Sequence, residues 1–415
     1  MKKVISLLFC CLAPTLHAQL SLEECQQRAQ ENYPLVRQYE LIEKTKEYTL
    51  SNLSKSNLPQ ISLSGKASYQ SDVTSLPFDF PGVPDELLPK DQYQAVVEVQ
   101  QNIWDGGNIR AKKQEAEARS DEQHGQLQVN MYALRERVNQ LYFGILLLDE
   151  QLKQNRLLQE QLARSLEQVT AYCANGIAHE ADMDAVKVEQ IKSRQQAIAL
   201  ENNRAAYRRM LALFVGSSAD SLHVVKPTSE TNSSSDIRRP ELDWYQAQEQ
   251  RIAIQEQNLK AAYMPRFSLF AQGGYANPGL NMLKDDFQAY YVVGARLSWN
   301  FGSLYTLKND RRKLDAERRM VQSNAETFLF NTRLQLTEKD AAIESLRKQM
   351  QEDDEMIRLQ SNIRRAAEVK TANGTLSVID MLQEINKESQ ARQNKVLHEV
   401  QLLLDIYQRK YLTNQ

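Results

Sequence analysis

The chain has 415 residues, of which 42% are hydrophobic and 25% are charged, and 51 Lys and Arg stand against 53 Asp and Glu. A charge balance so close to neutral excludes the basic surface of a nucleic-acid-binding protein, so no nucleic-acid partner is expected. The four cysteines and five histidines show no metal-ligand spacing. We expect Cys25 and Cys173 to be unpaired, and we expect no cofactor.

Residues 1–18 are typical of a secretory signal peptide. Lys2 and Lys3 precede an apolar run that ends near Ala18, so we expect a mature chain that starts at Gln19. Neither Cys10 nor Cys11 follows the small residue of a lipoprotein signal, so no lipid anchor is expected. After residue 18, no apolar run approaches the roughly 20 residues of a membrane-spanning helix. Any spanning must therefore come from strands.

Four stretches alternate apolar and polar residues, which predicts strands at about 60–72, 92–104, 266–276 and 287–301. In the first, Ile61 and Leu63 fall on one side and Ser62 and Ser64 on the other. Runs of about ten residues with one apolar and one polar face fit the strands of a transmembrane barrel. A half-buried sheet in a soluble domain is the alternative.

Four strands are too few to close a barrel, because about eight is the practical minimum. An open sheet edge in lipid would leave backbone groups unpaired. The barrel must therefore be shared between chains, and two, three or four copies would give 8, 12 or 16 strands. The sequence alone does not choose among these numbers.

The positions of proline predict very long helices. No proline occurs between Pro89 and Pro227 or after Pro278, and these tracts are rich in good helix formers. We expect long helices at about 107–172, 180–215, 303–371 and 378–411. The first would extend roughly 100 Å at about 1.5 Å per residue, which is longer than an ordinary domain core.

The sequence contains an internal repeat, in which motifs of the first half recur in the second half. "LPQISL" at residues 58–63 returns as "MPRFSL" at 264–269, and "ANGIAHEADM" at 174–183 returns as "ANGTLSVIDM" at 372–381. We therefore expect a tandem duplication with structural repeats at 19–215 and 237–415. The segment 216–236, rich in Ser, Thr and Gly, is the predicted linker.

With these features in place, the sequence resembles the TolC family of bacterial outer-membrane efflux proteins over essentially the whole mature chain. "LSLEECQQRAQENYPLV" resembles the family's first segment, and "RRPEL" at 238–242 resembles the start of its second half. "NIWDGGN" at 102–108 matches the strand-to-helix turn, with "WNFGS" at 299–303 as its shorter partner. The predicted turn residues are Gly106, Gly107 and Gly302.

The resemblance implies an α+β membrane protein that is a homotrimer. Each chain would give four strands to a 12-stranded β-barrel in the outer membrane, which continues into a long α-helical barrel in the periplasm. The loops at Ser71–Asp91 and near "NPGLNMLKDD" would face outside the cell. Besides outer-membrane lipid, the implied partners are a periplasmic adaptor (membrane fusion protein) and an inner-membrane transporter of RND, ABC or MFS type.

The resemblance also implies two sets of site residues at the periplasmic tip. Asp182 and Asp380 match family positions where carboxylates narrow the pore, and Gln383 stands where the pattern often has a second acid. A capping role in the first turn of a helix is the alternative for both aspartates. The residues expected to contact the adaptor are Asn175, Gly176, Ile177, Asn373, Gly374 and Thr375.

The implied function is a channel that exports small molecules such as drugs, toxic compounds or ions, and that opens when the adaptor and pump bind at the tip. A conduit for type I protein secretion is an alternative, and a soluble periplasmic coiled-coil scaffold is another. An enzyme is not expected. "HEADMD", with His179, Glu180, Asp182 and Asp184, lacks the HExxH spacing and a second histidine one turn later.

Overall fold

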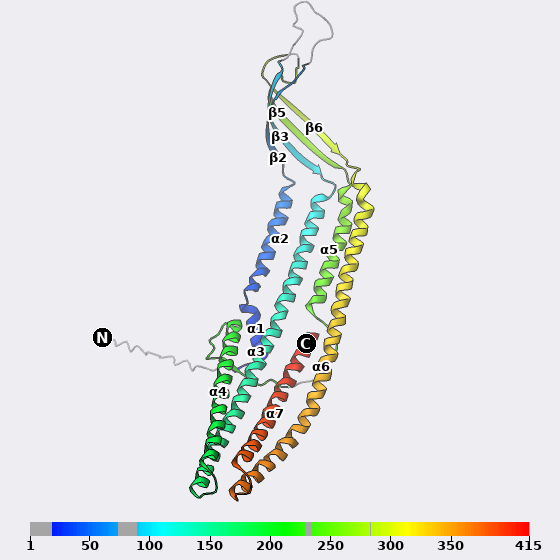
Figure 1. Ribbon diagram of the computed structural model, residues 1–415. Coiled ribbons are helices and arrows are strands. Elements are labelled where there is room, and N and C mark those ends of the chain that lie inside the picture. The colour runs from blue at the N-terminus through cyan, green and yellow to red at the C-terminus, as the bar shows by residue number, and fades with distance from the viewer. Residues whose placement is uncertain (1–18, 74–88, 229–234, 283, 415) are drawn as a thin grey trace, which may run out of the picture. The chain divides into compact units, whose positions relative to one another are not determined.

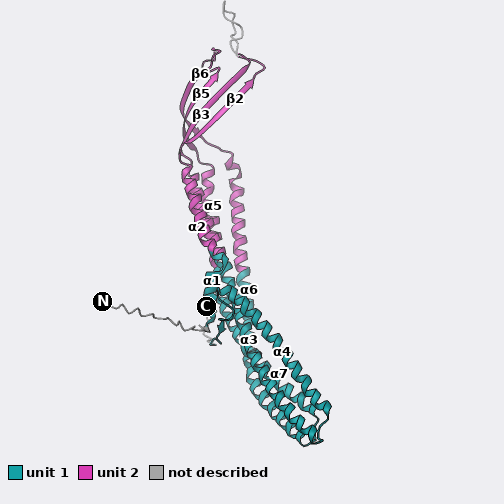
Figure 2. Cartoon of the chain, turned by 90° about the vertical axis from the view of Figure 1, so that its left-hand side faces the viewer, with its two compact units in different colours: residues 1–36, 128–240, 327–415 teal, residues 37–127, 241–326 magenta. Residues whose placement is uncertain are grey.

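A computed structural model describes residues 19–73, 89–228, 235–282 and 284–414 (Figure 1). The described chain is mostly helical with a small sheet, as predicted. It divides into two compact units, residues 1–36, 128–240 and 327–415 as unit 1 and residues 37–127 and 241–326 as unit 2 (Figure 2). Each predicted repeat contributes to both units. The predicted signal peptide and most of the predicted Ser71–Asp91 loop lie outside the described residues.

Unit 2 contains a four-stranded antiparallel sheet with the order β2-β3-β5-β6. Its strands are β2 (Gln60–Tyr69), β3 (Asp91–Trp104), β5 (Arg266–Asn277) and β6 (Gln288–Ser298). Two hairpins from distant parts of the chain are joined where β3 pairs with β5, with Val99 opposite Ala271. Within the chain, the outer edges of β2 and β6 have no neighbouring strand among the described residues.

The two faces of this sheet differ in character, because side chains alternate along each strand. One face is apolar and exposed to an unusual degree. Its most exposed members are Ile61 at 73%, Leu63 at 77%, Tyr291 at 77%, Val293 at 68% and Leu297 at 69%. The other face carries hydroxyl, amide and charged side chains, which hydrogen-bond across strands, as in the pair Gln272 and Glu98 at 3.0 Å.

The helices of unit 2 are α2 (Arg37–Lys55), α5 (Pro240–Ala262) and the first parts of α3 (Asn108–Ala174) and α6 (Ser303–Ala372). Charged pairs link neighbouring helices. Arg251 of α5 lies 2.5 Å from Glu122 of α3, and Arg318 of α6 lies 2.6 Å from Glu256 of α5. A small apolar cluster around Ile252 joins α5 to α6.

Unit 1 contains α1 (Leu22–Asn32), the short helix η1 (Pro34–Val36), α4 (Glu180–Val215), α7 (Val378–Thr413) and the remaining parts of α3 and α6. Its main core is built from α1, α3, α4 and α7, around Tyr142, Phe143 and Leu211. Gly144 allows α3 and α4 to approach closely, because a Cβ there would lie 2.8 Å from the ring of Tyr207. Among the described residues, no helix combines the length and the apolarity needed to cross a bilayer.

The segment that follows α4 is attached to this core through Tyr142. A short parallel pair joins β1 (Gln19–Leu20) to β4 (His223–Val224). The Tyr142 hydroxyl lies 2.9 and 2.7 Å from the carbonyl oxygens of Leu20 and Val225, within hydrogen-bond distance of both, and accepts from the Val225 amide at 3.0 Å. Burial raises the pKa of this phenol well above its usual range. The described part of the predicted linker therefore packs on unit 1.

Candidate functional site at the helical turns

Two helical turns close one end of unit 1 (Figure 2). The first joins α3 to α4 and the second joins α6 to α7. Both end their first helix with the same hydrogen bonds: the amide of Ile177 donates to the Tyr172 carbonyl at 2.9 Å, and that of Thr375 donates to the Lys370 carbonyl at 2.9 Å. Gly176 and Gly374 adopt φ of 73° and 70°, the left-handed conformation that such helix ends favour in glycine.

The two turns lie next to each other. A Cβ added to Gly374 would lie 3.9 Å from the Cγ2 atom of Ile177. An apolar cluster drawn from α3, α4, α6 and α7 packs behind them, with Leu162, Val186 and Met381 fully buried. The six predicted adaptor-contact residues are all exposed, and Ile177 presents an apolar side chain that is 49% exposed. The structure thus places these six residues in one exposed patch.

The two predicted gate aspartates occupy equivalent positions in the first turns of α4 and α7. Asp182 accepts a hydrogen bond from the His179 amide at 2.9 Å. Asp380 accepts one from the Ser377 hydroxyl at 2.7 Å. Carboxylates are favoured at the positive N-terminal end of a helix. The Asp182 side chain therefore caps its own helix, as in the alternative stated above, whereas the cap of α7 is Ser377, which accepts from the Asp380 amide at 3.1 Å while Asp380 holds its hydroxyl.

Gln383 lies one turn beyond Asp380 on α7 and is exposed. The described contacts include no hydrogen bond or ion pair that joins Asp182, Asp380 and Gln383 to one another. Within one chain the three residues share the same end of unit 1 without forming a cluster. A gate built from them would need further copies of the chain.

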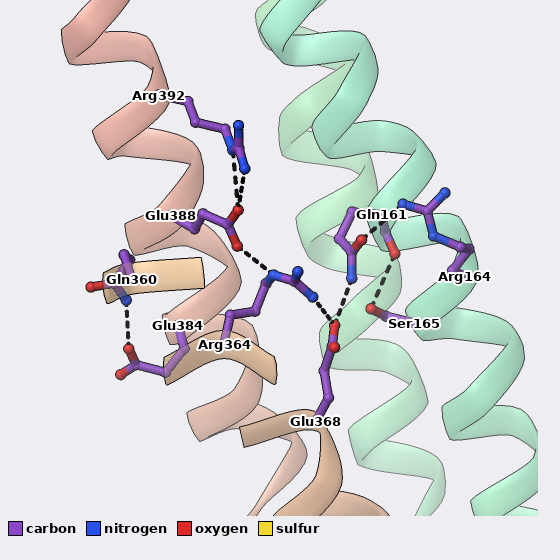
Figure 3. A network of polar contacts seen from close by, with 9 residues as sticks. All are labelled: Gln161, Arg164, Ser165, Gln360, Arg364, Glu368, Glu384, Glu388 and Arg392. Carbon is purple, nitrogen blue, oxygen red and sulfur yellow. Dashed lines mark hydrogen bonds and ion pairs between the residues drawn. The ribbon is translucent and has the colours of Figure 1, made fainter. Parts of the chain in front are cut away.

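A polar network lies behind the turns and connects α3, α6 and α7 (Figure 3). At its centre is Glu388 of α7, whose side chain is 8% exposed. Glu388 forms ion pairs with Arg364 of α6 and with Arg392 of its own helix, the latter at 2.7 Å. Arg364 also pairs with Glu368 at 2.5 Å.

The same network reaches α3 through an amide. The Gln161 side chain donates to Glu368 at 2.7 Å and accepts from Arg164 at 2.8 Å. A parallel contact joins α4 to α7, where Asn386 donates to Glu189 at 3.1 Å. A cavity of about 340 Å³ adjoins the network. The α3–α4 pair and the α6–α7 pair are therefore joined by partly buried polar contacts as well as by the apolar cluster.

The charge state of Glu388 follows from these contacts. Burial disfavours its charged form, but hydrogen bonds from Arg392 and Arg364 outweigh burial and hold the pKa of the carboxyl below its usual range. Burial likewise opposes the charge on Arg364, and its bonds to Glu388 and Glu368 keep its pKa raised. Glu388 and Arg364, at the centre of the network, are therefore both charged at neutral pH.

Sequence reasoning missed this network. The available signal was two oppositely charged pairs at i and i+4, Arg364 with Glu368 and Glu388 with Arg392. Such pairs are usually exposed, and nothing in the helical pattern showed that Glu388 would face α6. The contact between Gln161 and Glu368 spans 207 residues, so it depends on how the helices are packed.

The predicted strand-to-helix turns lie in unit 2. Gly106 and Gly107 adopt φ of 72° and 84°. Asp105 caps α3 with both carboxylate oxygens, which accept from the amides of Gly107 at 3.0 Å and Ile109 at 2.6 Å. The shorter turn at Gly302 is held by Asn300, whose side-chain oxygen accepts from the Gly302 amide at 2.9 Å.

Residues 26–217 match the family described as outer membrane efflux protein. These residues, almost all from the first of the two predicted repeats, carry the sequence pattern of this family. The chain is a protein of the outer membrane, and the matched family is one of channels and transport proteins rather than enzymes. No curated protein matches the sequence.

Solved structures agree with the family assignment. The outer membrane protein VceC from Vibrio cholerae matches this chain with a TM-score of 0.68 and 13% identity, covering 94% of this chain and 96% of that one. The CmeC outer membrane channel of Campylobacter jejuni matches with a TM-score of 0.67 and 13% identity, over 94% and 85%. The open state of the MtrE outer membrane channel of Neisseria gonorrhoeae gives 0.64 and 13%, over 94% and 88%. At these identities the likeness is one of fold.

Proposed function

We propose that three copies of this chain form an outer-membrane channel that exports small molecules from the periplasm. The observation that carries the proposal is the sheet of unit 2, which exposes an apolar face, presents a polar face on the other side and leaves both edges open. Lipid would cover the apolar face, and the polar face would line the pore. Pairing between copies would satisfy the edges of β2 and β6, because unpaired backbone groups are costly in lipid.

Twelve strands is the number that follows from three copies of a four-stranded sheet. The long helices would continue the barrel into the periplasm as a helical tunnel. The two hairpins of the sheet and the matching turns at Gly176 and Gly374 support a tandem duplication, in which each half supplies one hairpin and one pair of long helices. The predicted loop at "NPGLNMLKDD", between β5 and β6, would then face the exterior.

The turns at the end of unit 1 are the proposed docking place for a periplasmic adaptor, which would couple the channel to an inner-membrane pump. Support comes from the exposed patch around Ile177, Gly374 and Thr375. Asp182, Asp380 and Gln383 would form rings around the closed tip, where acidic side chains favour cations. Opening would require the α3–α4 and α6–α7 pairs to separate, which would break the contact of Gln161 with Glu368 and that of Asn386 with Glu189.

The test of the channel is made on the full chain purified from membranes in mild detergent. We expect light scattering to give the mass of a trimer, and planar bilayers to show a small conductance. A water-soluble monomer or dimer without conductance would contradict the proposal and favour the periplasmic scaffold. Export of a polypeptide without export of small molecules would instead favour type I secretion.

The gate has a separate test. Asn retains a side-chain acceptor for the helix caps, so Asp182→Asn with Asp380→Asn removes charge while preserving the turns. We expect higher conductance and a weaker preference for cations. Asp184→Asn is the matched control, because Asp184 is exposed on the same helix and pairs with Lys187 at 3.0 Å. Equal effects of the double variant and the control would remove the two aspartates from the gate.

A further inference from the structure

The polar face of the sheet carries more positive than negative charge. Lys66, Arg266 and Arg296 lie on this face, and Glu98 is its single acid among the described strand residues. Glu98 already accepts a hydrogen bond from Gln272 at 3.0 Å. If this face lines the pore, as the proposed function requires, each copy of the chain adds a net positive charge to the lumen of the barrel.

Two of these cations lie close together. Arg266 of β5 is opposite Ser298, and Arg296 of β6 is opposite Ser268, so the two arginines are diagonal neighbours on one face. Side chains in this relation are about 7–8 Å apart at their bases and within reach of each other. Two like charges repel at that distance, and an anion between them would relieve the repulsion.

Lys112 of α3 is a third cation close to the two arginines. Arg266, Arg296 and Lys112 all line one groove of about 430 Å³. In the part of the chain that the structure describes, none of the three forms an ion pair with a carboxylate. Asp105 also lines the groove, and each of its oxygens accepts from a backbone amide at the start of α3. Its single negative charge leaves the groove with a net positive charge. The two guanidinium groups and the ammonium group that line the groove therefore have N–H donors that no carboxylate of the described residues uses.

The local packing orients Arg296 for this role. Its guanidinium carbon lies 5.0 Å from the centroid of the Phe270 ring. The Phe270 ring itself covers Gly294, where an added Cβ would lie 2.8 Å from the ring. An aromatic surface of this kind holds the guanidinium by cation–π attraction and leaves its N–H groups available to a ligand.

We propose that Arg266, Arg296 and Lys112 form an anion-binding site in the lumen where the sheet meets the helices, and that the cargo that passes it carries carboxylate, sulfate or phosphate groups. This inference depends on the proposed channel and names the class of its substrate. It gives two places along the pathway opposite charge, with acids at the periplasmic tip and cations where the helices meet the barrel. Attraction to the groove should weaken as salt is added, because exposed charges are screened.

The experiment uses the full-length channel in planar bilayers, with the reversal potential measured in a potassium chloride gradient at low ionic strength. Arg266→Gln with Arg296→Gln should lower the permeability of chloride relative to potassium by about twofold or more, as loss of unit charges near the ion path implies. An unchanged ratio in a conducting double variant would overturn the anion site. Absence of any channel in the unsubstituted protein would instead overturn the proposed function.

A matched pair of single variants separates the groove from general surface charge. Lys66→Gln and Arg296→Gln each remove one positive charge from the same face, but Lys66 lines a different cavity, with Tyr290 and Met282. We expect the larger shift from Arg296→Gln. Equal shifts would contradict a specific site.

Two further measurements keep the inference testable if the double variant does not fold. Arg296→Lys should retain the anion preference, because it keeps the charge. Inorganic sulfate should reduce the chloride current of the unsubstituted channel more than that of Arg296→Gln, and equal block would count against the site.

Discussion

Apolar side chains are buried in the helical core of unit 1 but exposed on one face of the sheet of unit 2. In unit 1, Tyr142, Phe143 and Leu162 are at most 1% exposed, and each lies among side chains of the same chain. In the sheet, Leu63 and Tyr291 are 77% exposed. A single copy therefore completes the core of unit 1 but leaves the sheet uncovered. Burial within one chain stabilises the helices, whereas the sheet depends on surroundings outside it.

The largest expected effect is a loss of stability when a side chain in the core of unit 1 is truncated. Phe143 is 1% exposed and packs against Tyr142 and Tyr407, with ring centroids 5.9 and 5.4 Å away. Phe143→Ala should lower the free energy of unfolding by about 3–5 kcal/mol, because it removes buried apolar surface and leaves a cavity. Urea titration in detergent, followed by far-UV circular dichroism, measures the change. Lys348→Ala, at a side chain that is 73% exposed, should stay within about 0.5 kcal/mol.

The next largest effect is expected from a charged substitution on the apolar face of the sheet, which leaves the residues of unit 1 unchanged. Val293 is 68% exposed on the apolar face of β6. Val293→Arg should destabilise the protein by about 2–4 kcal/mol if lipid covers this position near the middle of the bilayer. Val292→Arg, on the polar face of the same strand, is the control and should be tolerated better. Trimer yield from the outer-membrane fraction compares the two, and equal yields would argue against lipid on the apolar face.

The smallest expected effect is a change in the stability of unit 1 with pH, which comes from Glu388. The pKa of Glu388 is lower in the folded protein than in the unfolded chain. Its ion pairs therefore stabilise unit 1 fully above the unfolded pKa of about 4.3, and this contribution disappears as pH falls through the lower folded pKa. Acid titration should loosen unit 1 over that range. In Glu388→Gln the corresponding part of the pH dependence should be absent, and an unchanged acid transition would contradict the role of Glu388.

The sequence predicted the helices and strands well, for reasons that are local. The absence of proline and the run of helix formers predicted α3, which extends for 67 residues. Period-two alternation predicted all four strands of the sheet, although β6 ends at Ser298 and the alternation continues to Phe301. The last residues, Trp299 to Phe301, lead into the turn at Gly302, where the Trp299 indole donates to the Tyr263 carbonyl at 3.0 Å.

The candidate site was predictable only in part. Gly176 and Gly374 were found because each turn needs a residue that tolerates positive φ. The capping contact of Asp182 was foreseen as an alternative. The pairing of Glu388 with Arg364, and the groove that unites Arg266, Arg296 and Lys112, were not predicted. Both depend on which helix faces or strands come together, and alternation within one segment does not contain that information.

The most direct test of the account asks what covers each face of β2. Single cysteines at Ile61, Ser62, Leu63 and Ser64 are introduced into Cys173→Ser protein in native membranes. Cys25 can remain, because it is buried and burial raises the pKa of its thiol to about 12. A water-soluble maleimide should label positions 62 and 64 rapidly, and positions 61 and 63 should instead react with a lipid-soluble reagent. Uniform labelling of all four by the water-soluble reagent would contradict a membrane-spanning sheet.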